Sequence, residues 1–302
     1  MNGQDEAAAR QRTGLLAGFG AYALWGLLPL YFKALHGVSP FEMVAHRVVW
    51  SVAFLIIVIA ASRLYPAFVA ACRQPRIIAA LALCSVLIAA NWLIYIWAVD
   101  TNHIVAASLG YFLNPLVNVL LGTLVLKERL GRGQAISVGI AAIGVAILAV
   151  GEWQTLWISL SLALTFGIYG LVRKLTPVPA AVGLGIETAL LAIPALIVLG
   201  WFAANGTMMF GHGTMLTLGL IAAGAVTSVP LLLFAVAARQ LPLVTLGLMQ
   251  YVAPTLQFLS GVLLFGEALS PERWASFLLI WGALALFVWD SLRLARRARA
   301  AT

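Results

Sequence analysis

Charged residues are scarce in this chain of 302 residues, where they make up 9% of the sequence against 63% for hydrophobic residues. A soluble domain carries roughly 25% charged residues, so this chain has too few to cover a water-exposed surface. Apolar runs of about 20 residues, enough to cross a hydrocarbon core of about 30 Å, recur along the whole sequence. The composition therefore predicts an all-α polytopic membrane protein.

Cysteines and catalytic motifs are also scarce. The two cysteines, Cys72 and Cys84, have neither the number nor the spacing of a disulfide framework or a metal site. The sequence contains no Walker A, HExxH or GxSxG pattern, and its four histidines have no helical metal-ligand spacing. We therefore expect no enzyme, no cofactor, no metal site and no ATP-driven transport by this chain alone.

Ten apolar runs predict ten transmembrane helices joined by short loops, which leaves no room for a soluble domain. They lie near residues 14–32, 43–62, 77–99, 105–126, 134–150, 153–172, 182–202, 215–238, 244–265 and 274–292. The first run is longer than a signal-peptide core of about 7–15 residues, so we expect a retained helix.

The basic residues predict the orientation. Most of the 18 lie in the N-terminus, in alternate loops and in the C-terminus: Arg10, Arg12, Arg63, Arg73, Arg76, Lys127, Arg129, Arg132, Arg173, Lys174, Arg239, Arg293, Arg296, Arg297 and Arg299. Only Lys33, Arg47 and Arg273 fall on the other side. This bias predicts an inner-membrane protein with both termini in the cytoplasm, and it explains the net charge of +8 without nucleic-acid binding.

An internal repeat links residues 108–130, SLGYFLNPLVNVLLGTLVLKERL, to residues 247–269, GLMQYVAPTLQFLSGVLLFGEAL. At an offset of 139 the matching pairs are Leu109 and Leu248, Pro115 and Pro254, Asn118 and Gln257, Gly122 and Gly261, Glu128 and Glu267, and Leu130 and Leu269. The repeat unit therefore spans five helices, residues 1–151 and 152–302. Because five is odd, the two units must be inverted relative to each other, an architecture typical of secondary transporters. We expect a monomer, with a homodimer as the alternative.

The whole chain resembles the drug/metabolite transporter superfamily, whose halves are EamA-type domains, and in particular its RarD branch. The resemblance is carried by AYALWGLLPLYFK, AHRVVWS, NWLIYIWAV, ASLGYFLNPLVNVLLG, YGLVRK and QYVAPTLQFL, between residues 21 and 260. It implies an inner-membrane carrier of small metabolites that works by alternating access, with a central cavity lined by both halves. Related branches export amino acids, including aromatic ones.

Two polar helix faces are candidate substrate-binding surfaces. Tyr111, Asn114 and Asn118 share a face of the fourth span, and Gln250 and Gln257 occupy matching positions in the ninth. Polar side chains at bilayer depth face the bundle or a wet cavity, so these residues line a cavity or, alternatively, bond the helices to each other. Within these faces Pro115 and Pro254 are candidate hinges.

Aromatic residues with polar neighbours form a second candidate group, because they can stack on an amphipathic solute or simply pack the bundle. They are Tyr22 and Trp25 in the first span, Asn91 and Tyr95 in the third, and Tyr169 in the sixth.

Charges within spans are costly and predict gating or coupling. The pair His46 and Arg47 lies near the outer end of the second span, where Arg47 could attract a substrate carboxylate, close an outer gate, or extend to the membrane surface. Glu187, inside the seventh span, could carry a coupling proton, or it could have a gating or structural role.

Together these features predict a secondary exporter of small metabolites such as amino acids, aromatic or amphiphilic compounds included. The alternative is drug or amphiphile efflux, or translocation of a lipid-linked solute, through the same cavity.

Overall fold

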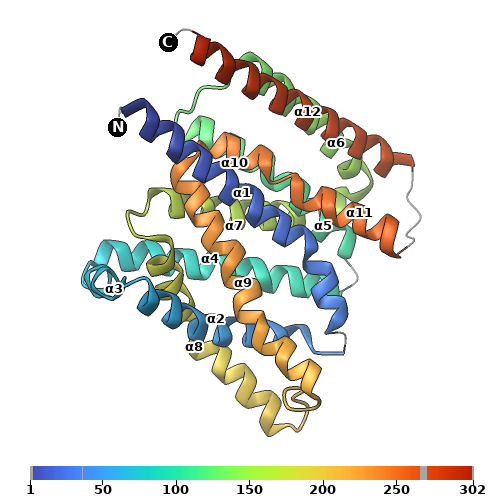
Figure 1. Cartoon of the computed structure of the whole chain (residues 1–302). Coiled ribbons are helices and arrows are strands. Elements are labelled where there is room, and N and C mark those ends of the chain that lie inside the picture. Colours follow the sequence, from blue (N-terminus) through green and yellow to red (C-terminus); the bar gives the residue numbers. More distant parts are fainter. Residues whose placement is uncertain (1–2, 36, 102, 266–270, 301–302) are drawn as a thin grey trace.

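The computed structural model describes residues 3–35, 37–101, 103–265 and 271–300, and every regular element within these ranges is a helix (Figure 1). The helices are α1 (Gly3–Ala34), α2 (Pro40–Ala61), α3 (Tyr65–Cys72), α4 (Pro75–Asp100), α5 (Ile104–Leu124), α6 (Arg132–Ala149), α7 (Leu156–Leu175), α8 (Ala180–Ala204), α9 (Thr214–Gln240), α10 (Leu243–Met249), α11 (Val252–Phe265) and α12 (Pro271–Ala300). A short 3-10 segment, η1 (Val150–Thr155), joins α6 to α7.

Most of these helices have the length and composition of membrane spans. Helices α1, α2, α4, α6, α7, α8 and α9 are long and apolar enough to cross a bilayer, while α5 and α12 contain shorter apolar stretches, Leu109–Leu124 and Trp274–Asp290. The chain is therefore an all-α polytopic membrane protein, as predicted. The short helix α3, which lies between the second and third spans, was not expected.

The ninth predicted span differs from the prediction because it is broken into α10 and α11 at Gln250 and Tyr251. Pro254 lies in the first turn of α11 and has no N–H to donate to the carbonyl of Gln250. The amide of Ala253 donates to that carbonyl instead, at 3.1 Å. The matching Pro115 lies inside an unbroken α5, so only one of the two candidate hinges interrupts its helix.

The helices pack in pairs that recur between the two halves of the chain. Helix α1 packs on α9 and α11, and its counterpart α7 packs on α4 and α5. Helix α2 packs on α9, as α8 packs on α4. The remaining large contacts join counterparts directly: α2 with α8, α5 with α10, and α6 with α12. The packing therefore has an approximate two-fold symmetry.

Counterpart helices run in opposite directions. Tyr251, just after α10, donates its hydroxyl to the carbonyl of Phe112 at 3.3 Å, and these two residues are 139 apart in the sequence. Further along α5, past its end, Glu128 accepts a hydrogen bond from the amide of Leu243 at the start of α10. Residue numbers thus rise along one helix as they fall along the other. The predicted boundary between the units falls in η1, while Glu267 and Leu269 of the repeat lie outside the described residues.

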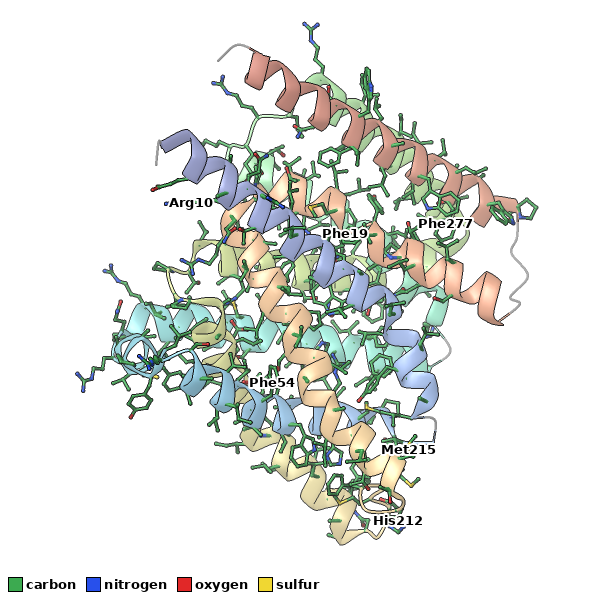
Figure 2. All side chains as sticks on the ribbon, in the orientation of Figure 1. Arg10, Phe19, Phe54, His212, Met215 and Phe277 are labelled. Atoms are coloured by element: carbon green, nitrogen blue, oxygen red, sulfur yellow. The ribbon has the colours of Figure 1, made fainter. Side chains whose placement is uncertain are left out.

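Helix α1 begins and α12 ends on the same side of the protein (Figure 1). We call this side the terminal side and the other one the opposite side. Figure 2 shows Arg10 near the terminal side and His212 and Met215 near the opposite side, with side chains filling the space between the helices.

Candidate functional site

Arg47, near the start of α2, is held between helices of both halves. Its Nε donates a hydrogen bond to Oγ1 of Thr227 in α9 at 2.9 Å. The guanidinium carbon lies 4.7 Å from the ring centroid of Trp92 in α4 and 5.8 Å from that of Phe32 in α1, both within cation–π range. Arg47 is half-buried, so part of the guanidinium is accessible.

Three tyrosines complete these surroundings. The phenol groups of Tyr111, Tyr31 and Tyr95 lie near the guanidinium of Arg47. The rings of Tyr95 and Tyr111 lie edge to face, 5.9 Å apart. Tyr31 donates its hydroxyl to a backbone carbonyl of α9 at 2.8 Å. We call the whole group the Arg47 cluster: Arg47, Tyr31, Phe32, Trp92, Tyr95, Tyr111 and Thr227. Of the predicted site residues, the structure brings Arg47, Tyr95 and Tyr111 together here.

His46 and Glu42 lie beside this cluster but serve a different contact on the opposite side. Glu42 accepts hydrogen bonds from the amides of Met209 at 2.8 Å and Phe210 at 3.2 Å. The His46 ring stacks on Phe210 with centroids 5.0 Å apart, and its Nε2 lies 3.6 Å from the Glu42 carboxylate. The loop between α8 and α9 is thereby fixed to the start of α2. Glu42 is engaged here and not with Arg47.

The two amide faces meet in part. Asn118 donates its side-chain amide to the side-chain oxygen of Gln250 at 2.9 Å, and both residues are buried. Gln257 donates to the carbonyl of Trp25 at 3.2 Å. Asn114 is also buried, and its side-chain oxygen has no hydrogen-bond partner among the described residues. The amides thus bond helices of the two halves and leave two buried acceptors, the side-chain oxygens of Asn114 and Asn118, without a partner among the described residues.

Asn91 joins α4 to α7. Its side-chain amide donates to the carbonyl of Leu162 and to the hydroxyl of Thr165, each at 2.9 Å. Its donors are thus occupied by the bundle.

Five aromatic rings pack together between the Arg47 cluster and the terminal side. Neighbouring centroids are 5.4 Å apart for Phe166 and Phe234, 5.7 Å for Tyr22 and Trp25, and 6.1 Å for Tyr169 and Phe234. Tyr22 is fully buried and donates its hydroxyl to a backbone carbonyl of α10 at 3.1 Å. We call these five residues the aromatic core. Three predicted substrate-binding residues, Tyr22, Trp25 and Tyr169, are members of it.

Glu187 forms a buried ion pair. Its carboxylate lies 3.2 Å from a terminal nitrogen of Arg173, and the hydroxyl of Tyr169 donates to it at 3.2 Å. Arg173 also donates to the carbonyl of Ala180 at 3.2 Å. Gly183 makes room for the guanidinium, because a Cβ at this position would overlap it. A residue counted as a loop charge in the sequence, Arg173, is therefore an intramembrane partner of Glu187.

A second carboxylate joins the two halves on the terminal side. Glu128 accepts hydrogen bonds from the amides of Leu243 at 2.8 Å and Val244 at 3.0 Å, and Lys174 lies 3.9 Å from it. Lys174 also donates to the carbonyl of Leu241. We call these five residues the Glu128 bridge.

The sequence offered a signal for both carboxylate contacts that hydropathy and charge counting passed over. Glu128 is an acid between two basic neighbours at the end of an apolar run, where topology alone favours basic residues only. Arg173 precedes Gly183 and Glu187, whose spacing of four places them on one face of α8. Neither signal identifies the partner, because the partner depends on the tertiary packing.

Comparison with known proteins places this arrangement in a family. Residues 12–150 match the EamA-like transporter family. The chain is 47% identical over 296 residues to Protein RarD of Streptomyces exfoliatus, covering 98% of this chain and 94% of the relative. It is 46% identical over 293 residues to an uncharacterized transporter of Pseudomonas aeruginosa, covering 96% and 98%. The chain belongs to the RarD branch of the EamA-like transporters.

A solved crystal structure has the same fold. It superimposes on this EamA-like transporter with a TM-score of 0.71 and 21% sequence identity, covering 90% of this chain and 96% of the other. The family membership makes the chain a membrane transporter and not an enzyme, as the lack of catalytic motifs predicted. The family match and the relatives place the chain in the drug/metabolite transporter superfamily, as the resemblance in the sequence implied.

Proposed function

We propose that this transporter is a secondary exporter of small metabolites such as amino acids, with aromatic or amphiphilic compounds preferred, and that it works by alternating access. The observation that carries the proposal is the Arg47 cluster, where five aromatic side chains of the first half surround a half-buried cation that is hydrogen-bonded to Thr227 of the second half. A cation with accessible donors binds a carboxylate, and the ring faces bind an apolar side chain.

The way the terminal side is closed supports alternating access. The aromatic core and the Glu128 bridge both lie between the Arg47 cluster and the terminal side, and both join the two halves. The two-fold packing offers a route between inward-open and outward-open conformations. When the aromatic core and the Glu128 bridge separate, the counterpart contacts can form on the opposite side. On the opposite side, the contact of Glu42 and His46 with the loop between α8 and α9 is a candidate gate.

We assign the terminal side to the cytoplasm and the protein to the inner membrane. The excess of arginine and lysine on that side supports this orientation.

For Glu187 we favour a gating role over a freely exchanging proton. Its ion pair with Arg173 is buried and lies next to the aromatic core through Tyr169, so separating α7 from α8 requires the pair to break. Pro254, at the break between α10 and α11, is the better placed of the two prolines to act as a hinge.

The amide residues form the second part of the site. Asn114 has a buried and unbonded oxygen and, unlike Asn118, is not tied to Gln250, so it is the member best suited to bind a donor of a solute that enters the bundle. Gln250 and Asn118 would release their mutual bond only when α10 moves.

Drug or amphiphile efflux, or translocation of a lipid-linked solute, is the second candidate function. It uses the same aromatic surfaces but does not require Arg47, because a neutral amphiphile has no carboxylate.

Counterflow tests the proposal. Proteoliposomes preloaded with one unlabelled amino acid at a time are diluted into the labelled form, with protein-free liposomes as the control. Transient accumulation of a labelled aromatic amino acid or another amphiphile is expected. Accumulation of no member of the panel would rule out the proposed amino-acid transport.

A further inference from the structure

Every partner that the described residues give Arg47 is neutral. They are the hydroxyl of Thr227, the faces of Trp92 and Phe32, and the phenol groups of three tyrosines. Only Nε makes a hydrogen bond within the described part of the chain, so the two terminal nitrogens of the guanidinium keep their donors free.

Other ionic side chains in the same bundle are neutralised or bonded by the protein itself. Arg173 has Glu187 at 3.2 Å and Lys174 has Glu128 at 3.9 Å. Glu42 has two backbone amides. Arg47 differs from them, because it keeps a positive charge that its described neighbours do not balance.

A positive charge held among apolar rings favours a bound anion. An uncompensated charge at bilayer depth is costly, and an anion that pairs with it in two parallel hydrogen bonds removes that cost. A zwitterion brings a second cationic group, which the neutral members of the Arg47 cluster can meet only with ring faces and hydroxyls. An organic anion without an ammonium group leaves the loaded site neutral.

We propose that the Arg47 cluster selects organic monoanions with an aromatic or amphiphilic body, and that export is driven by the membrane potential. This inference rests on the proposed function and narrows it: among small metabolites, the same site takes organic anions in preference to zwitterionic amino acids. The loaded site is neutral and the empty site is positive, so one complete cycle moves one negative charge. A potential that is negative inside the cell then drives the anion outward without a coupling ion.

Three solutes of one skeleton separate the charge classes. N-acetylphenylalanine carries one negative charge at neutral pH, phenylalanine is a zwitterion, and N-acetylphenylalaninamide is neutral. Each is labelled and offered to proteoliposomes whose potential is set with potassium gradients and valinomycin. Protein-free liposomes give the passive leak.

The expected result is selective transport of N-acetylphenylalanine, with a steady distribution that follows the potential. A monoanion at equilibrium changes its concentration ratio about tenfold for each ~60 mV, because 100 mV acts on one charge with about 2.3 kcal/mol and 1.4 kcal/mol is a factor of ten. Arg47→Gln is expected to lower transport of the anion to the leak, which is also the level expected for the neutral amide with wild type. Arg47→Lys is expected to retain part of the anion transport, since it keeps the charge but loses the planar fork.

The outcomes separate the inference from the proposed function. Transport of phenylalanine that equals or exceeds that of the anion, or transport independent of the potential, overturns the inference and leaves a secondary amino-acid transporter. Unchanged anion transport by Arg47→Gln overturns it as well. Failure of all three solutes and of the whole amino-acid counterflow panel overturns both.

Discussion

Replacing Glu128 with alanine should shift the protein toward conformations that are open on the terminal side. The carboxylate accepts two backbone hydrogen bonds, from Leu243 at 2.8 Å and Val244 at 3.0 Å, which tie the end of α5 to the start of α10. Hydrogen bonds to a charged group contribute about 1.5–3 kcal/mol each when buried. Glu128 is partly exposed, with 17% of its side chain accessible, so water can bond the freed backbone amides and reduce the cost of removing the carboxylate.

We take about 2 kcal/mol for the free energy by which Glu128 stabilises the conformation that is closed on the terminal side. Its loss corresponds to about a thirtyfold change in the ratio of open to closed protein. Glu128→Gln should give a smaller shift, because the amide oxygen can still accept one of the two bonds.

Cys84 provides a native reporter for this opening. It is fully buried in the hydrophobic cluster that contains the aromatic core, whereas Cys72 in α3 is exposed. In a Cys72→Ser background, labelling of Cys84 by a membrane-impermeant maleimide measures how often the terminal side opens. We expect Glu128→Ala to speed this labelling by about the same thirtyfold factor.

The matched control is Glu6→Ala, which removes an exposed acid from α1. Equal labelling rates in wild type, Glu6→Ala and Glu128→Ala would refute the view that the Glu128 bridge holds the terminal side closed.

Three further predictions concern contacts between helices, each measured by unfolding in detergent. Asn118→Leu or Gln250→Leu alone should lower the free energy of unfolding by about 1–3 kcal/mol, because each leaves a buried amide unpaired. The double variant should lose less than the sum of the two single losses. Additive losses would contradict a direct bond. Glu187→Gln or Arg173→Met alone should lower the free energy of unfolding by about 3–5 kcal/mol, because each leaves a buried charge unpaired. Replacing both residues with methionine should restore much of this loss. A small loss in either single variant would show that the pair is not buried together. Gly247→Ala should lower the free energy of unfolding by about 1–3 kcal/mol, because its Cβ would lie 2.8 Å from the carbonyl oxygen of Pro115. Gly139→Ala is the control and should not destabilise the protein, because a Cβ there meets open space. Equal effects of the two variants would contradict the close approach of α10 to α5.

The membrane spans could be predicted because hydropathy is a local property of the sequence. Each of the ten predicted spans coincides with a helix or, in the ninth, with the pair α10 and α11. The break at Gln250 was foreseeable only as a hinge candidate, since Pro115 occupies the matching position in a continuous helix. Tertiary packing, which the sequence does not reveal locally, decides which proline interrupts its helix.

The candidate site could be predicted only in part. Arg47, Tyr95 and Tyr111 were found as polar or charged residues in apolar runs, and the structure brings them together. Trp92 and Thr227 could not be placed with them, because aromatic and hydroxyl residues are common in spans and their partners lie on other helices.

The charged contacts show the same limit. Arg173 was counted as a topology charge and Glu128 as a matching position of the repeat, and neither description says what the residue binds. Only the folded arrangement of α7, α8 and α10 reveals these partners.

Counterflow of a labelled aromatic solute in proteoliposomes, with wild type beside Arg47→Gln, tests the central claim most directly. If the Arg47 cluster is the substrate site of a secondary transporter, wild type accumulates label transiently above the protein-free level and Arg47→Gln does not accumulate the anionic solute. Equal accumulation of that anion by both proteins, or none by either with any solute tested, would contradict it.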